Sequence, residues 1–135
     1  MSLAIALAIV GAMFGSSVFI WTDVEDGKQI AVHWDYLGRT NGFADKYTAL
    51  FSLPVAALFA TAISWLSPLI GWVKRDFLLS FLTVGVPGVL AVGHGMILLY
   101  ATGFPIGDYS PTFSIAVVLF CIIAVFLKLS GRQTL

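Results

Sequence analysis

The chain has 135 residues, of which 59% are hydrophobic and 10% are charged, and its formal net charge at pH 7 is zero. So few charged residues cannot cover a water-soluble surface, and the composition therefore predicts an integral membrane protein rather than a soluble domain. The basic residues form no dense cluster, which excludes nucleic acid as a partner.

The first apolar run covers residues 3–21 and contains no Asp, Glu, Lys or Arg. As an α-helix with a rise of ~1.5 Å per residue it would span ~28 Å, close to the hydrocarbon thickness of a bilayer. A cleaved signal peptide is the competing interpretation, but such peptides need a basic segment before the apolar run, and this run has none. We therefore expect a transmembrane helix over residues 3–21.

Three further uncharged runs follow at residues 47–73, 77–101 and 112–127, and each is long enough to cross a bilayer. Backbone groups in hydrocarbon find no partner outside their own segment, so these runs are expected to be helical. Pro54 and Pro87 fall within the second and third runs, where transmembrane helices tolerate proline. The expected fold class is all-α: a single integral membrane domain over the whole chain, built as a four-helix transmembrane bundle.

The loops on the two sides of the membrane differ in their content of Lys and Arg. One side carries Lys74, Arg75, Lys128 and Arg132, whereas the other carries Lys28, Arg39 and Lys46 among several carboxylates. Cytoplasmic loops are enriched in Lys and Arg. Both termini are therefore expected in the cytoplasm, and the loop between the first two helices is expected to be extracytoplasmic.

That loop, residues 22–46, contains more than half of the charged residues and one of the two histidines of the chain. Apolar side chains alternate along it at Ile30, Val32, Trp34 and Tyr36. An extended segment would therefore place His33 and Asp35 together on its opposite face. Because a plain solvated connector does not need these apolar residues, we expect them to be buried against something.

Two sites within the loop favour tight turns. Gly38 and the Asn41-Gly42 pair tolerate positive φ, so the chain is expected to turn twice before Lys46 reaches the membrane. The result would be a compact cap whose Trp and Tyr side chains lie at the level of the lipid headgroups.

Two interpretations of the polar residues in this cap are open. A structural hydrogen-bond network would lock the cap shut by joining His33, Asp35, Asn41 and Lys46. Alternatively, His33 and Asp35 would bind a metal ion with help from the nearby carboxylates of Asp23, Glu25, Asp26 and Asp45. Because no second histidine and no cysteine stands at ligand spacing, the network is preferred, and neither a metal nor a cofactor is expected.

His94 is the only His, Asp, Glu, Lys or Arg within a predicted crossing segment. Ionisable residues in such places face the interior of a bundle. We expect a neutral imidazole bonded to a backbone carbonyl or a hydroxyl, ~10 Å below the outer boundary, where it would meet the underside of the cap. Proton relay or haem ligation would need partners that the sequence does not supply.

The stretch IAVHWDYLGRTNGFADK resembles the signature of the DUF1648 membrane family, found in bacterial toxin-immunity proteins of the SdpI type. The shared positions are His33, Asp35, Gly38, Asn41, Gly42 and Lys46, and Pro54 is similar to a proline common in that family. The chain lacks the proline that usually precedes the histidine, and no counterpart of the family's second membrane half follows residue 101. The resemblance implies a multi-pass protein of the bacterial inner membrane more strongly than it implies immunity activity.

Two functions from different classes are compatible with these features. In the first, the cap binds a peptide, a toxin or a partner protein, as an immunity protein or a sensor would. In the second, the chain is an accessory structural subunit of a larger membrane protein complex, because Gly11 and Gly15 have the spacing that lets helix backbones approach closely. Their partner would preferably be a helix of the same chain, or else another chain of a homo- or hetero-oligomer. An enzyme is not expected, because no nucleophile stands beside a base.

Overall fold

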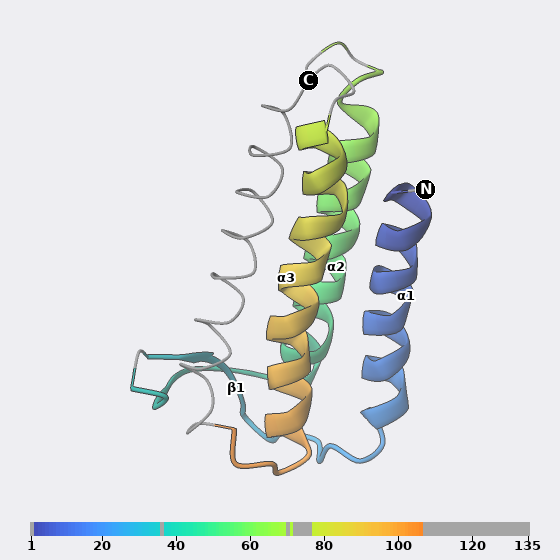
Figure 1. The fold of residues 1–135 in the computed structure, drawn as a ribbon. Coiled ribbons are helices and arrows are strands. Elements are labelled where there is room, and N and C mark those ends of the chain that lie inside the picture. The colour runs from blue at the N-terminus through green and yellow to red at the C-terminus, as the bar shows by residue number, and fades with distance from the viewer. Residues whose placement is uncertain (1, 36, 70, 72–76, 107–135) are drawn as a thin grey trace.

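The computed structural model describes residues 2–35, 37–69, 71 and 77–106. In this part of the chain three helices lie side by side: α1 (Ser2–Ile20), α2 (Lys46–Leu66) and α3 (Phe77–Ala101) (Figure 1). Between α1 and α2 the chain forms two strands, β1 (Ile30–Trp34) and β2 (Thr40–Ala44), which we call the hairpin together with their connecting turn. The hairpin lies at the end of the helices where α1 and α3 finish and α2 begins (Figure 1).

All three helices are long and apolar enough, by length and composition, to cross a membrane. α1 and α3 coincide closely with the runs expected at residues 3–21 and 77–101. α2 is shorter than the expected run and ends at Leu66 instead of residue 73. The run expected at residues 112–127 lies outside the described residues.

Pro68 explains the early end of α2. The Ser67 N–H still donates to Ile63 O, but proline has no N–H to offer to the next carbonyl, that of Ser64. The Ser67 hydroxyl donates to Ser64 O at 3.2 Å and takes the place of the missing donor. Gly71, with a φ of 72°, provides the left-handed conformation of the turn that follows.

The expectation of an all-α four-helix bundle is wrong, because the described residues form three helices and a two-stranded antiparallel sheet. The fold of this part of the chain is therefore mixed α/β. The argument for helices throughout holds only inside hydrocarbon, where backbone groups have no water to bond. The hairpin lies outside the crossing runs, so its strands can leave an edge unpaired, and β1 covers Ile30, Val32 and Trp34 of the segment that was expected to be extended.

Two glycines of the hairpin have different physical roles. Gly38 has a φ of 80°, and its N–H closes the turn by donating to Asp35 O at 3.0 Å. Gly42 instead belongs to β2, opposite His33, and a Cβ at Gly42 would lie 2.9 Å from His33 Cβ. The second tight turn expected at Asn41-Gly42 is therefore absent, and close approach of the two strands is what requires this glycine.

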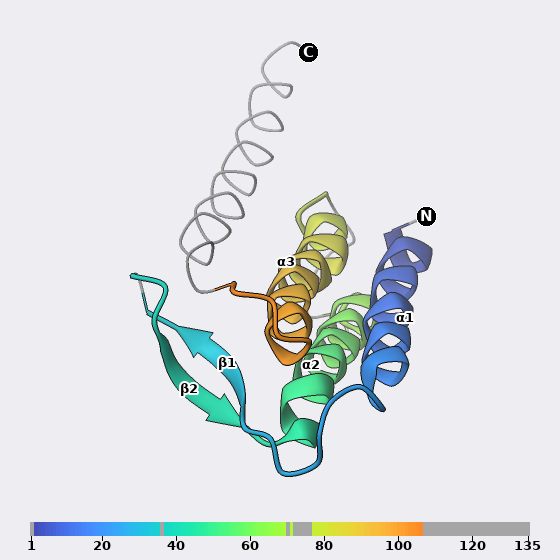
Figure 2. The same ribbon diagram turned by 90° about the horizontal axis from the view of Figure 1, so that it is seen from below.

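The largest buried apolar cluster lies where the hairpin meets the helices. It combines the end of α1, the start of α2, the end of α3 and the root of β1, through Ile20, Val24, Ile30, Ala49, Leu50, Ile97 and Ala101. Figure 2 shows that the strands run from this root toward one side of the bundle. Burial of the root fixes the hairpin to all three helices, while its tip extends away from them.

The small-residue face of α1 is open in the described part of the chain. A Cβ added at Gly11 or at Gly15 would meet no described atom within 4 Å. α1 packs through a different face, made of Ala6, Val10, Met13, Ser17 and Ile20. The described helices therefore do not supply the intramolecular partner that was preferred for the Gly11 and Gly15 face.

Candidate functional site

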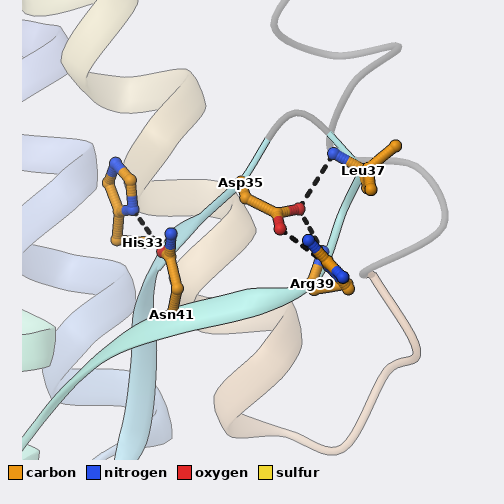
Figure 3. Close-up of polar contacts among 5 residues, drawn as sticks. All are labelled: His33, Asp35, Leu37, Arg39 and Asn41. Atoms are coloured by element: carbon orange, nitrogen blue, oxygen red, sulfur yellow. Dashed lines mark hydrogen bonds and ion pairs between the residues drawn. The ribbon is translucent and has the colours of Figure 1, made fainter.

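The tip of the hairpin is built around the carboxylate of Asp35 (Figure 3). Oδ1 accepts hydrogen bonds from the backbone N–H groups of Leu37 and Arg39 at 2.8 and 2.9 Å, and Oδ2 accepts one from Arg39 Nε at 2.8 Å. These donors, the Arg39 backbone N–H above all, hold the pKa of Asp35 below its usual range. The carboxylate is therefore the structural acceptor that closes the turn.

His33 lies apart from this turn and pairs across the sheet with Asn41 (Figure 3). Its Nδ1 atom is 2.5 Å from Asn41 Oδ1. An amide oxygen only accepts hydrogen bonds, so Nδ1 carries a proton and donates it to Asn41. Both residues are exposed, and the imidazole is therefore accessible from outside the protein.

Lys46, the first residue of α2, has two partners for its ammonium group. Nζ donates to Asp26 Oδ1 at 2.8 Å and lies 4.2 Å from the centroid of the Trp21 ring. The Lys46 side chain is only 10% exposed, whereas that of Asp26 is 92% exposed. A cation at a helix N-terminus is opposed by the helix dipole, and these two partners offset that cost. Lys46 thereby ties the segment that leaves α1 to the start of α2.

Two more polar contacts join the segments that flank the hairpin to helix ends. The Asp45 carboxylate caps α2 by accepting from the Thr48 hydroxyl at 2.7 Å and from the Thr48 N–H at 3.1 Å. The hydroxyl bond first, and then the N–H bond, holds the pKa of Asp45 below its usual range. On the other side, Lys28 Nζ donates to Ala101 O at 3.0 Å, at the C-terminal end of α3, where the helix dipole favours a cation.

The four polar residues expected to form one network are divided among three separate contacts. His33 and Asn41 bond to each other, whereas Asp35 pairs with Arg39 and Lys46 pairs with Asp26. Throughout the residues that the structure describes, no three His, Cys, Asp or Glu side chains gather where they could hold a metal ion. The carboxylates of Asp35 and Asp45 instead accept hydrogen bonds that fix the turn and the helix cap.

His94 bonds to α1 and not to the hairpin. Its Nε2 atom lies 3.0 Å from Ser17 Oγ and 3.2 Å from Met13 O, and the residue is 2% exposed. Ser17 Oγ lies 2.6 Å from Leu50 O and 3.1 Å from Met13 O, so its single proton is used by a carbonyl. His94 Nε2–H is therefore the donor toward Ser17. The resulting polar chain, His94 to Ser17 to Leu50, joins α3, α1 and α2.

Pro54 explains why Leu50 O benefits from a donor on another helix. In an α-helix the N–H of residue 54 would bond to this carbonyl, and proline has no N–H. Leu50 and Pro54 are both buried, so water does not replace the missing donor. The Ser17 hydroxyl supplies it instead. A proline inside α2 is thus compensated by a serine of α1, which His94 of α3 orients.

Sequence reasoning missed Arg39 and Ser17, the residues that complete these contacts. Arg39 follows Asp35 by four positions, a spacing that signals pairing on a helix, and here a turn brings the two together. The sequence pointed to Ser17 only indirectly, through Pro54. Pro54 identifies Leu50 O as a carbonyl in need of a donor, but the residue that faces this carbonyl depends on how the helices pack.

The site is thus defined by geometry: an exposed hairpin held by local polar contacts, above a buried polar chain that joins the helices. The likeness to the DUF1648 signature stays a prediction carried by the motif residues. No protein-family model, no curated protein and no solved structure matches this chain.

Proposed function

We propose that the protein is a membrane-anchored recognition module whose hairpin binds a peptide, a toxin or a partner protein on the extracytoplasmic side of the bacterial inner membrane. One observation carries this proposal. The hairpin is fixed from within by its own polar contacts, and yet Leu37 and Phe43 on it are 56% and 52% exposed. A rigid projection with exposed apolar side chains has the properties of a binding surface.

The polar residues of the hairpin support the proposal by holding its shape before any partner arrives. Asp35 fixes the turn. Beside the hairpin, Lys28 bonds to the C-terminal end of α3, and Lys46 of α2 bonds to Asp26 in the segment that leads to β1. A surface that is already ordered loses less conformational entropy on binding than a mobile loop does. The hairpin is therefore suited to recognition with a defined geometry.

The outward side chains of the hairpin have the composition of a binding surface. The Arg39 side chain is 72% exposed although its Nε bonds to Asp35, and His33 and Asn41 are exposed beside it. Arginine and aromatic residues dominate the energetics of protein interfaces. Exposed apolar residues of the three helices face lipid in a membrane, but the hairpin lies outside the crossing runs, so lipid chains do not account for Phe43 and Leu37.

The side of the membrane and the kind of partner come from the sequence. The side of the membrane that carries the two termini has more Lys and Arg residues than the side that carries the hairpin. This difference favours cytoplasmic termini and an extracytoplasmic hairpin. The resemblance to the DUF1648 family favours a peptide or a toxin as partner, since that module occurs in immunity proteins. Neither the charge difference nor the resemblance requires signalling across the membrane.

Site-specific photocrosslinking in bacterial membranes tests the proposal. A photoreactive phenylalanine analogue replaces Phe43 on the hairpin or, as the control, Phe59, which is 63% exposed on α2. We expect a crosslinked protein or peptide of defined mass at position 43 and none at position 59. The proposal also requires that Arg39→Ala reduce the yield at position 43. Equal yields at both positions, or no adduct at position 43, would contradict recognition through the hairpin.

A second candidate function, an accessory subunit of a larger membrane complex, is favoured by the open face of α1 around Gly11 and Gly15. The same crosslinking experiment separates the two functions. A photoreactive analogue at Phe19, which is 80% exposed on α1, would crosslink to a membrane protein if α1 packs against another chain. Migration on a native gel at many times the 14.5 kDa of the chain would agree with that function.

A further inference from the structure

One edge of β2 is not covered by any segment that the structure describes. Within the described residues the sheet consists of β1 and β2 alone, so β2 is paired on one side only. β1 lies on the side of the helices, where Val32 and Trp34 pack against the cluster at the hairpin root, and β2 lies on the outer side (Figure 2). Every residue of β2 is at least partly exposed. The unpaired edge of β2 therefore faces away from the described helices.

This edge carries main-chain groups that can pair with another strand. Alternate N–H and C=O groups of an edge strand point away from its neighbour and have no partner in the sheet. In the described part of the chain, the backbone of β2 bonds only within the sheet. The strand Thr40–Ala44 also contains neither the proline nor the charged side chain that often protects an edge. An extended segment of another molecule can therefore add to β2.

Two exposed side chains of different chemistry accompany this edge: Arg39 immediately before β2 and Phe43 near its end. Among the described residues only the Nε atom of Arg39 is bonded, so its Nη1 and Nη2 atoms can bind a carboxylate. The other charged residue of the hairpin is Asp35, and its carboxylate already accepts three hydrogen bonds within the turn. The hairpin therefore offers a partner a cation and an aromatic ring, and the complementary partner is acidic and apolar.

We propose that the partner of the hairpin is an extended peptide segment that adds to β2 as a third, antiparallel strand, with a carboxylate for Arg39 and an apolar side chain for Phe43. Antiparallel pairing is slightly more stable per residue than parallel pairing. In this direction the apolar residue of the peptide comes about four positions before the acidic one, because strands that pair side by side advance at the same rate. This inference rests on the proposed function and names the class of partner that the same surface would take.

The side chains are needed because β2 offers only a short edge. The strand has five residues, and its register shifts at Asn41, which has no Cα partner in β1. Few N–H and C=O groups therefore point outward, and each gains only a little when a peptide replaces water as its partner. In strand addition the main chain supplies affinity and the side chains supply specificity. Arg39 and Phe43 would thus select among extended peptides.

Binding of a synthetic peptide to the full chain in mild detergent tests the main-chain pairing. The probe is Thr-Phe-Thr-Val-Thr-Glu-Thr with an N-terminal fluorophore and a C-terminal amide, and fluorescence anisotropy reports its binding. Two further probes carry N-methyl groups on alternate residues, in the two possible phases. Only alternate N–H groups of a third strand point toward β2, so one phase should weaken binding about tenfold and the other less than about threefold. Equal effects of both phases, or no binding of the unmethylated probe, would overturn the proposal.

A cycle of substitutions tests the contact with Arg39. Replacing the Glu of the probe by Gln, or Arg39→Gln in the protein, should each weaken binding about threefold. The two changes together should weaken it no further, because both remove the same contact. Arg75→Gln, at a position expected on the opposite side of the membrane, is the matched control and should leave the binding of both probes unchanged. Additive effects of the two changes would show that Arg39 does not meet the carboxylate, and would overturn the proposed register.

Amide exchange measured by NMR gives a second readout that does not depend on substitutions. The probe should slow the exchange of alternate amides in residues 40–44 and leave the exchange of residues 46–66 unchanged. These outcomes differ from those of crosslinking at position 43. A crosslinked adduct at position 43, combined with unchanged exchange in residues 40–44, would keep recognition by the hairpin and overturn strand addition.

Discussion

The tip of the hairpin and the polar chain inside the bundle use similar chemistry in opposite surroundings. At the tip, Asp35 satisfies backbone N–H groups beside an Arg39 side chain that is 72% exposed. In the bundle, Ser17 donates to the backbone carbonyl of Leu50, and Ser17 and the neighbouring His94 are 0% and 2% exposed. In water, a broken bond is replaced by a bond to solvent, so its net value is small. Inside the bundle there is no such replacement, and the same kind of contact can specify how helices pack.

The largest effect is expected from Ser17→Ala. It removes the hydroxyl that donates to Leu50 O and accepts from His94, so two buried groups lose a partner and the free energy of unfolding should fall by about 2 kcal/mol. Titration with SDS in mixed micelles measures this free energy. Ser16→Ala is the matched control, because Ser16 Oγ donates to Met13 O of its own helix, and it should change stability little.

Pro54→Ala provides a sharper form of this test. Alanine restores the N–H that an α-helix offers to Leu50 O, so Ser17→Ala should cost less than half as much in the Pro54→Ala background as in the native chain. A cycle of the four proteins gives the coupling energy directly. Additive effects of the two substitutions on the free energy of unfolding would contradict the conclusion that the Ser17 hydroxyl replaces the N–H that Pro54 lacks.

An intermediate effect, confined to the hairpin, is expected from Gly42→Ala. The new Cβ would lie 2.9 Å from His33 Cβ, so the strands must move apart, at a cost of about 1 kcal/mol. Amide hydrogen exchange over residues 30–44 should become faster, while exchange in the helices stays the same. Gly11→Ala is the control, since its Cβ meets nothing, and it should leave hairpin exchange unchanged. Faster exchange in the helices as well would show that the hairpin and the bundle are not separable.

The smallest effect is expected from acidification of the hairpin tip. The pKa of Asp35 is lowered in the folded protein, so its contribution to stability is present above the pKa of the unfolded chain and is lost as the pH falls through the lowered value. The amide signals of Leu37 and Arg39 in NMR spectra should shift in that acidic range. Asp35→Asn should abolish the shift while leaving that of Thr48, which reports Asp45, in place. Identical titrations of Leu37 in both proteins would contradict the role of this carboxylate.

Much of the fold was predictable from hydropathy, and the hairpin was only partly so. The alternation around His33 predicted an extended segment, and Gly38 was correctly expected to turn the chain. The fold class was wrong because the argument against sheets applies only in hydrocarbon. Gly42 was assigned to a turn because its need for space beside His33 is visible only when the second strand is in place.

The sequence by itself determined where helices long enough to cross a membrane lie, because long uncharged runs have no other stable conformation in lipid. It also identified the loop that concentrates the polar residues. Only the tertiary structure decided the partners of those residues: Arg39 for Asp35, Asp26 for Lys46, and Ser17 for both His94 and the carbonyl freed by Pro54. The physical reason is range. Hydropathy acts through the bilayer on each segment alone, whereas a hydrogen bond needs two atoms within about 3 Å, and packing decides which atoms meet.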